Sequence, residues 1–285
     1  MGELILYVTK CSIADFNIDF KTDIKTFSKI MRNYIGTFNN ADMEICISDK
    51  DLIFEKEIQE DVDIEYLTTY KLSAYHRKLS DKLPSHEAFV LQSACFDVDG
   101  VGVAFAAHSG TGKSTHMRLW QDYLGDKMTI VNGDKPIVRF FEEGENDNKI
   151  PPPQAVPLPL GKGGKNSDNP SVSCADSSLY AKEPNIPYAY GTPWNGKEKL
   201  GCNMRTPLKH ICFIERSETN YVEKIAPKDA IDRIFNQVYM PKDPMAVMKT
   251  IELINRLINS CKLWIIHCNM EPEAAEVAYK AIFNS

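Results

Sequence analysis

The chain has 285 residues, of which 43% are hydrophobic and 25% charged, a composition that suits one large globular domain or two small ones. Its formal net charge of −6 disfavours nucleic acid as the main partner, because phosphate backbones are bound by basic surfaces. No charged-then-apolar leader opens the sequence and no apolar run approaches the roughly 20 residues that span a bilayer, so we expect a cytoplasmic protein without membrane contact.

The first 85 residues are predicted to form a small α+β region. Apolar residues at helical spacing predict helices over residues 22–35 and 62–79, and alternation over residues 43–47 predicts a strand between them. A short apolar run at residues 4–8 predicts a further strand. No residue pattern here indicates chemistry, so we expect a packing or recognition role.

From residue 86 the elements are grouped around a glycine-rich loop. Strands are predicted over residues 89–97 and 101–107, and Asp99-Gly100 between them suits a tight hairpin turn, whose two central positions need positive φ. A helix over residues 114–123 follows the loop, and the next strand is expected at residues 128–131. The order strand, loop, helix is that of a phosphate-binding unit.

The segment 143–186 differs from the rest of the chain in composition. Half of the 16 prolines fall between Pro151 and Pro187, and Tyr180 is the only aromatic residue of the segment. Such a segment buries too little apolar surface to offset the entropy of ordering it. We therefore expect a flexible insertion, either disordered or a mobile lid.

The C-terminal third returns to alternating elements. Strands are predicted at residues 187–190, 211–214 and 263–266, and helices at residues 227–239, 244–258 and 272–283. Pro227 and Pro244 each stand where a first helical turn tolerates proline. The pattern as a whole predicts an α/β fold.

Residues 108–115, His-Ser-Gly-Thr-Gly-Lys-Ser-Thr, contain what a phosphate-binding loop requires. Gly110 and Gly112 allow the turn and a close approach to phosphate, and the following helix adds its positive end. Lys113 supplies a charge for the β- and γ-phosphates and Ser114 a hydroxyl for Mg²⁺. The remaining candidate nucleotide contacts are Ser109, Thr111 and Thr115. Ala107 stands where the usual pattern begins with glycine.

Asp134 follows the strand predicted at residues 128–131 and is the candidate second ligand of Mg²⁺. The alternative interpretation is a turn or capping aspartate. Near the loop, we expect His108 and His116 to have packing or hydrogen-bonding roles and Arg118 to form a surface ion pair.

Five segments resemble one known family. The loop at residues 106–116 looks like that of the HPr kinase/phosphorylase-like family, which shares its fold and a Ser-Gly-x-Gly-Lys core with phosphoenolpyruvate carboxykinase. Residues 131–136 are similar to the acidic strand end of that family. Residues 190–197, 205–208 and 268–275 are similar to an uncharacterised branch of it. The resemblance covers about residues 86–285.

The resemblance implies an α/β fold with a P-loop core of the HPr kinase and carboxykinase type and a mixed sheet. A small α+β region would occupy residues 1–85 and the kinase-like domain residues 86–285. It also implies ATP and Mg²⁺ as cofactors and transfer of the γ-phosphate to a hydroxyl, with Lys113 and Asp134 as catalytic residues. Lys197 and Arg205, which lie in the similar segments, are candidate contacts to phosphate or acceptor, with ordinary surface charge as the alternative.

Two positions depart from the family pattern. Gly133 precedes Asp134 where the family has two acids, so we assign Asp134 to Mg²⁺ and leave the general base unassigned; Gly133→Asp is expected to be tolerated unless Gly133 has positive φ. Gln92 stands where relatives often have histidine. The metal ligands of a carboxykinase are not found, so we do not expect that reaction.

The acceptor is left open by the sequence. A serine of a protein or peptide is the first candidate and a small hydroxylated metabolite the second. A nucleotide-sensing module without turnover is the alternative of a different class. The oligomeric state and a reverse phosphorylase activity are also left open.

Overall fold

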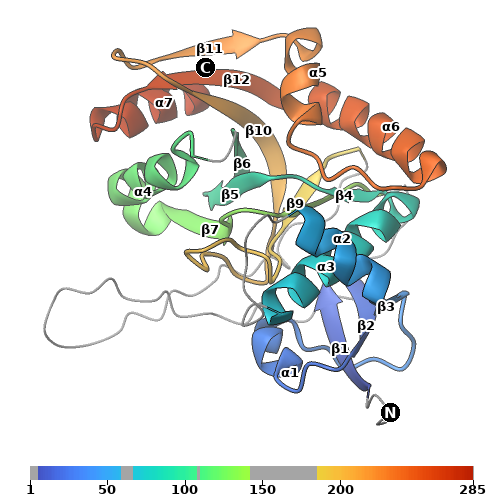
Figure 1. Cartoon of the computed structure of the whole chain (residues 1–285). Helices are drawn as coiled ribbons and strands as arrows, with labels where there is room; N and C mark the ends of the chain where they lie inside the picture. Colours follow the sequence, from blue (N-terminus) through green and yellow to red (C-terminus); the bar gives the residue numbers. More distant parts are fainter. Residues whose placement is uncertain (1–5, 59–66, 108–109, 142–184, 285) are drawn as a thin grey trace, which may run out of the picture.

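The computed structural model describes residues 6–58, 67–107, 110–141 and 185–284 (Figure 1). Nearly all of the insertion predicted at residues 143–186 therefore lies outside the described residues, as do His108 and Ser109 of the glycine-rich loop.

The N-terminal region contains a three-stranded sheet in the order β1-β2-β3. Its elements are β1 (Tyr7–Ile13), β2 (Phe16–Thr22), β3 (Met43–Cys46), α2 (Asp49–Ile58) and α3 (Leu67–Lys82). β1 and β2 are antiparallel, whereas β2 and β3 are parallel. The strand expected at residues 43–47 is confirmed, and the described part of the second predicted helix is present as α3.

The helix predicted over residues 22–35 is wrong as one element. Thr22 ends β2, and only the single turn α1 (Phe27–Ile30) and the 3₁₀ turn Arg32–Tyr34 follow. Of the apolar residues that gave the helical spacing, Ile24, Phe27 and Met31 are buried against the small sheet, whereas Ile30 and Ile35 are exposed. Two consecutive short turns can bury residues three or four apart without forming a continuous helix.

A second sheet of nine strands forms the centre of the molecule, with the strand order β4-β8-β9-β10-β6-β5-β7, and with β12 paired to β10 and β11 to β12. Its strands are β4 (Ala88–Val90), β5 (Ser93–Val98), β6 (Val101–Ala106), β7 (Met128–Asn132), β8 (Ile137–Arg139), β9 (Tyr188–Tyr190), β10 (Arg205–Arg216), β11 (Tyr221–Ile225) and β12 (Lys262–Cys268).

Strand direction brings several strand ends to one edge of this sheet. β10 is parallel to both β6 and β12, and β5 is antiparallel to both β6 and β7. β6, β7, β10 and β12 therefore run in the same direction, and their carboxyl ends meet at the same edge. In open α/β sheets this is the edge at which ligands bind.

Two details of the predicted strands are resolved by the structure. The single strand expected at residues 89–97 is two strands, because Leu91 and Gln92 leave the ladder and donate their backbone N–H groups to Pro136 and Gln237. The hairpin turn is confirmed, with φ of 49° at Asp99 and 86° at Gly100.

Helices cover both faces of the nine-stranded sheet (Figure 1). α4 (Lys113–Leu124) and α7 (Glu273–Phe283) pack on one face, and α5 (Pro227–Phe235) and α6 (Pro244–Ser260) pack on the other. The result is a mixed α/β fold of helix, sheet and helix layers, which confirms the fold class at this coarser level.

The N-terminal region is joined to the larger sheet by a shared hydrophobic cluster, which includes Phe20 and Tyr75 from one side and Ile137 and Tyr188 from the other. A buried polar contact lies beside this cluster. Asp15, at the tip of the β1–β2 hairpin, accepts hydrogen bonds from the Tyr190 hydroxyl at 2.6 Å and from Arg205 at 3.2 Å.

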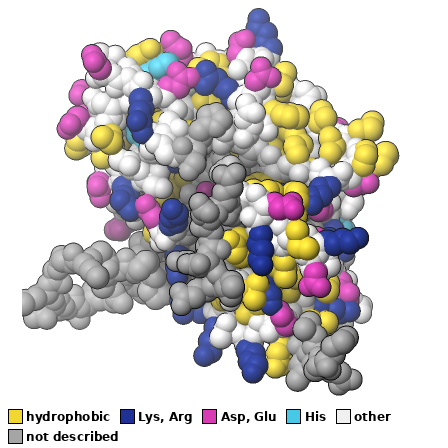
Figure 2. All heavy atoms as spheres, in the orientation of Figure 1, with side chains coloured by type: hydrophobic (Ala, Val, Ile, Leu, Met, Phe, Trp, Pro, Cys, Tyr) yellow, Lys and Arg dark blue, Asp and Glu magenta, His cyan; other side chains and the backbone are white. Residues whose placement is uncertain are grey.

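The outer surface of α6 carries exposed apolar side chains, seen as a hydrophobic cluster at that edge of the molecule (Figure 2). Met245 and Met248 are 72% and 65% exposed. α6 is 17 residues long, and no helix within the described ranges has both the length and the apolar character needed to cross a bilayer.

Candidate functional site

The glycine-rich loop connects the carboxyl end of β6 to the first turn of α4. Gly110 and Gly112 have φ of +80° and +121°, a region that side-chain-bearing residues rarely adopt. A Cβ added at either position would meet no atom within 4 Å. The glycines are therefore required for backbone conformation rather than for lack of space.

Helix α4 presents its positive end to this loop. Gly112 precedes its first residue, Lys113, and the first intrahelical bond shown there runs from the His116 N–H to the Gly112 carbonyl. The N–H groups of the first turn are thus available to an anion. Met117 and Trp120 anchor the helix in the core beneath the loop, so this end is held in position.

Lys113 is folded back onto the loop. The residue is only 9% exposed, and its Nζ donates to the Ala107 carbonyl at 2.5 Å. Burial lowers the pKa of Lys113, an effect that the nearby Asp134 carboxylate opposes and Lys135 reinforces. Lys113 nevertheless lines the pocket described below.

Arg216 braces the loop from the neighbouring strand. It is the last residue of β10, and it donates to the Gly110 carbonyl at 2.6 Å and the Thr111 carbonyl at 3.2 Å. Because β10 is parallel to β6, the ends of these two strands are neighbours. Sequence reasoning missed Arg216, since only the strand order brings it to the loop.

Asn132 organises the turn that carries Asp134. Its Oδ1 accepts from the N–H groups of Asp134 and Lys135 at 2.9 and 2.7 Å, and its Nδ2 donates to the carbonyl and hydroxyl oxygens of Thr192 at 3.2 and 3.0 Å. The Thr192 hydroxyl in turn donates to the Lys135 carbonyl at 2.8 Å. Asn132 is 0% exposed. The sequence singled out residues 131–136 and 190–197 but did not predict the hydrogen bonds between Asn132 and Thr192 that join them.

The segment 195–200 lies over the turn. Gly196 has φ of +79°, and a Cβ there would lie 3.1 Å from Cβ of Asp134. A Cβ on Gly133 would lie 3.1 Å from the Asn195 carbonyl oxygen and 3.3 Å from that of Leu200. Gly133 does not have positive φ, but Gly133→Asp would still have to displace this backbone, so tolerance of that substitution is no longer expected.

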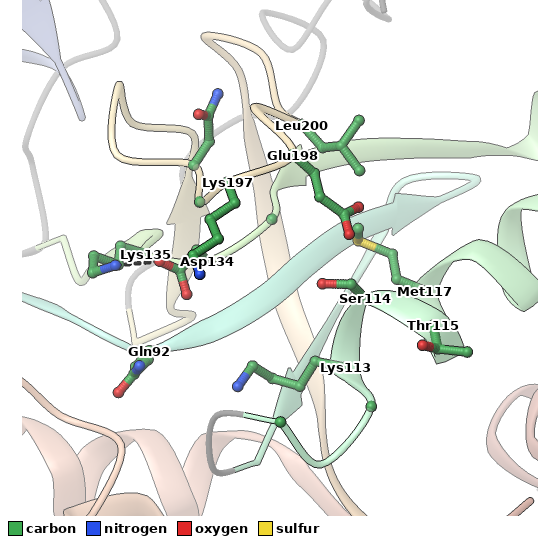
Figure 3. A pocket seen from close by; sticks show the side chains of 15 residues that line it. Gln92, Lys113, Ser114, Thr115, Met117, Asp134, Lys135, Lys197, Glu198 and Leu200 are labelled. Atoms are coloured by element: carbon green, nitrogen blue, oxygen red, sulfur yellow. Dashed lines mark hydrogen bonds and ion pairs between the residues drawn. The ribbon is translucent and has the colours of Figure 1, made fainter. Parts of the chain in front are cut away.

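These parts line a pocket of about 510 Å³ that is open to solvent. It is lined by seven of the predicted site residues, Gly110, Gly112, Lys113, Ser114, Thr115, Asp134 and Lys197, together with Gln92 and Lys135. Lys113 and Ser114, from the first turn of α4, and Asp134, which follows β7, extend into the same space (Figure 3). The Asp134 carboxylate is paired with the Lys135 ammonium group.

The other predicted residues are placed differently. Arg205 has a side chain that is 1% exposed and ion-paired to Asp15, so it is not available to a ligand of this pocket and its expected phosphate contact is not supported. Thr111 does not belong to the pocket lining, and Ser109 lies outside the described residues. The expected ion pair of Arg118 is confirmed, with Glu198 at 2.8 Å.

His116 has the packing role expected of it. It is buried beside Phe105, and the Trp120 indole N–H donates to its Nε2 at 3.3 Å. Burial lowers the pKa of His116 to about 4, so the imidazole is neutral at pH 7. His116 is therefore excluded as a cationic phosphate contact.

The donor set of the pocket suits Mg²⁺ bound together with a nucleotide. Mg²⁺ takes oxygen ligands and is usually held by one or two protein groups plus phosphate oxygens and water. Ser114 and Asp134 provide one hydroxyl and one carboxylate. Among the described residues no cluster of three or more histidine, cysteine, aspartate or glutamate side chains could hold a metal by itself.

Comparison with known proteins adds little. No protein-family model and no curated protein matches the chain. A solved structure, the HPr(Ser) kinase/phosphatase from Coxiella burnetii, is matched over 59% of this chain and 90% of that chain, at 9% sequence identity and a TM-score of 0.21. This similarity to a kinase is too weak to bear on the site, whose chemistry follows from its own residues.

Proposed function

We propose that the protein is an ATP-dependent phosphotransferase of the HPr kinase-like type, acting on a hydroxyl acceptor. One observation carries the proposal. The glycine-rich loop with its two positive-φ glycines, the first turn of α4 and Asp134 from the end of β7 all line the same pocket. Loop amides, a lysine, a hydroxyl and an acid around one space are the parts that phosphoryl transfer requires.

Each residue has a defined role in this proposal. The first-turn N–H groups of α4 and the Lys113 ammonium group bind the β- and γ-phosphates, so Lys113 must leave the Ala107 carbonyl when nucleotide binds. Ser114 and Asp134 hold Mg²⁺, and Lys135 releases Asp134 for that purpose. When bound, Mg²⁺ neutralises charge on the β- and γ-phosphate oxygens.

The transfer itself requires little covalent chemistry of the protein. The acceptor oxygen forms a bond to the γ-phosphorus while the bond from that phosphorus to the β,γ-bridging oxygen breaks. ADP leaves with the electron pair of that bond, and the hydroxyl proton is released to solvent. Positioning and charge neutralisation are the main contributions of the chain.

The test is nucleotide binding and turnover in variants of the loop and the acid. Lys113→Ala and Asp134→Asn should each weaken Mg-ATP binding by at least about tenfold, or 1.4 kcal/mol, because each removes a charged contact to the ligand. Binding is measured by calorimetry at several Mg²⁺ concentrations, and folding by circular dichroism. Lys228→Ala, an exposed position on α5, is the matched control.

The outcomes separate the candidate functions. ATP affinity within twofold of the parent in Lys113→Ala would contradict the nucleotide site. Unchanged Mg²⁺ dependence in Asp134→Asn would move the metal elsewhere. Binding without transfer of label from γ-labelled ATP to a cell extract would identify a nucleotide sensor, a candidate favoured by the single carboxylate at the β7 end.

A further inference from the structure

A second pocket, of about 780 Å³, adjoins the first. Lys135, Asn195 and Gly196 line both pockets, so the two spaces share a wall. The second pocket is formed by α1, the 3₁₀ turn Arg32–Tyr34 and α3 of the N-terminal region on one side, and by the segment 193–201 on the other. No role has been assigned to it so far.

The charge of this pocket is of one sign. The charged side chains that line it are Lys29, Arg32, Lys135 and Lys199, although acids outnumber bases in the chain by 39 to 33. Lys135 is neutralised by Asp134. No acid within the described ranges lies at ion-pair distance from Lys29, Arg32 or Lys199. Three uncompensated cations around one cavity favour an anionic occupant.

The remaining lining is that of a small-molecule site. Thr26, Thr69 and Ser73, which carry hydroxyl groups, are among its lining residues. Trp194 forms a wall that is fixed in place, because its Nε1 donates to the Leu72 carbonyl at 3.0 Å. The volume falls within the roughly 300–1,000 Å³ of typical ligand pockets and is too small for a folded partner.

We propose that this second pocket binds the phosphate acceptor, and that the acceptor is a small hydroxylated molecule bearing carboxylate or phosphate groups. The proposal rests on the proposed phosphotransferase function and specifies its substrate class. The anionic groups of the acceptor contact Lys29, Arg32 and Lys199. Its hydroxyl extends beside Lys135, Asn195 and Gly196, which line both pockets, to the γ-phosphate in the first pocket. The bonds made and broken are those given above. The N-terminal region is then the part that recognises the acceptor.

The first experiment follows label from γ-labelled ATP into a cell extract separated into protein and low-molecular-mass fractions. The expected result is a labelled small molecule that is anionic before phosphorylation. Arg32→Glu and Lys199→Glu should each lower transfer at subsaturating extract by about tenfold, the loss of one charged contact. Mg-ATP affinity should stay within twofold, and Lys228→Glu should change neither value.

The second experiment is independent of turnover. With the first pocket filled by a non-hydrolysable ATP analogue, Trp194 fluorescence is followed while the low-molecular-mass extract is added as separate anionic and neutral fractions. The anionic fraction alone should change the signal. Trp194→Phe removes the reporter and shows how much of the change comes from Trp120 and Trp264.

The outcomes distinguish the two proposals. Failure of the parent protein to bind Mg-ATP would overturn the proposed function itself. With ATP binding intact, a labelled protein band, a labelled neutral acceptor, unchanged transfer in both charge-reversal variants, or no response of Trp194 to the anionic fraction would each overturn the anionic acceptor.

Discussion

Replacing Asn132 by alanine should disturb both the stability of the protein and its Mg²⁺ site. The buried amide makes two accepted and two donated contacts, the donated ones both to Thr192. If the contacts to Thr192 count as one to two bonds, three to four hydrogen bonds are lost. At about 1 kcal/mol each, with little water access to compensate, the free energy of unfolding should fall by about 3–4 kcal/mol.

The functional effect follows from the backbone that Asn132 holds. Without its Oδ1, the N–H groups of Asp134 and Lys135 lose their acceptor, and the turn is no longer fixed relative to α4. Asp134 itself is unchanged, so nucleotide binding without Mg²⁺ should be nearly normal. The contribution of Mg²⁺ to nucleotide affinity should fall by about tenfold, equivalent to 1.4 kcal/mol.

The assays are urea unfolding followed by circular dichroism, and nucleotide titrations with and without Mg²⁺. Thr192→Val removes the other end of the same contact and should show a smaller effect in both assays, whereas Thr192→Ser keeps the hydroxyl and should resemble the parent. Stability within about 0.5 kcal/mol of the parent, with unchanged Mg²⁺ dependence, would refute the role given to Asn132.

Three further substitutions test other parts of the structure. Arg216→Ala should lower nucleotide affinity by about three- to tenfold by releasing the loop carbonyls, with stability changed by less than about 0.5 kcal/mol; unchanged affinity in the same titration would contradict the brace. Gly191→Ala would place a Cβ 1.8 Å from the Cys202 carbonyl oxygen, so the free energy of unfolding measured in urea should fall by about 3 kcal/mol or more. An unchanged urea midpoint would show that the backbones at Gly191 and Cys202 do not approach so closely. Asp15→Ala takes a carboxylate from the buried Arg205 and should cost about 3 kcal/mol, seen as a lower Tm; an unchanged Tm would mean that the hairpin tip contributes nothing to the junction.

Local sequence was sufficient where local physics decides the outcome. Asp99-Gly100 specified its hairpin because the turn needs positive φ, and Gly125 ended α4 in the same way. The periodicity of α6 and the proline at its start predicted that helix nearly to its ends. Two glycines before Lys113 similarly predicted the loop conformation that the structure shows.

Prediction failed where neighbours distant in sequence override the local pattern. Residues 22–35 have the spacing of one helix, but β2 extends to Thr22 and only two short turns follow. Gly133→Asp was expected to be tolerated, but the backbone of the segment 195–200 lies too close to Gly133 to accommodate a side chain without moving. Arg205 looked like a ligand contact because of its place in a motif, yet it is buried at the junction with Asp15.

The sequence by itself therefore determined which chemical groups are available: a loop with glycines that adopt positive φ, the lysine and hydroxyl that follow it, and an acid after the next strand. Only the tertiary structure decided which residues meet. The antiparallel β5 lies between β6 and β7, and β10 lies on the other side of β6, so strand order brings Asp134 to the pocket and Arg216 to the loop. Strand order depends on long-range pairing, and no residue pattern along the chain encodes it directly.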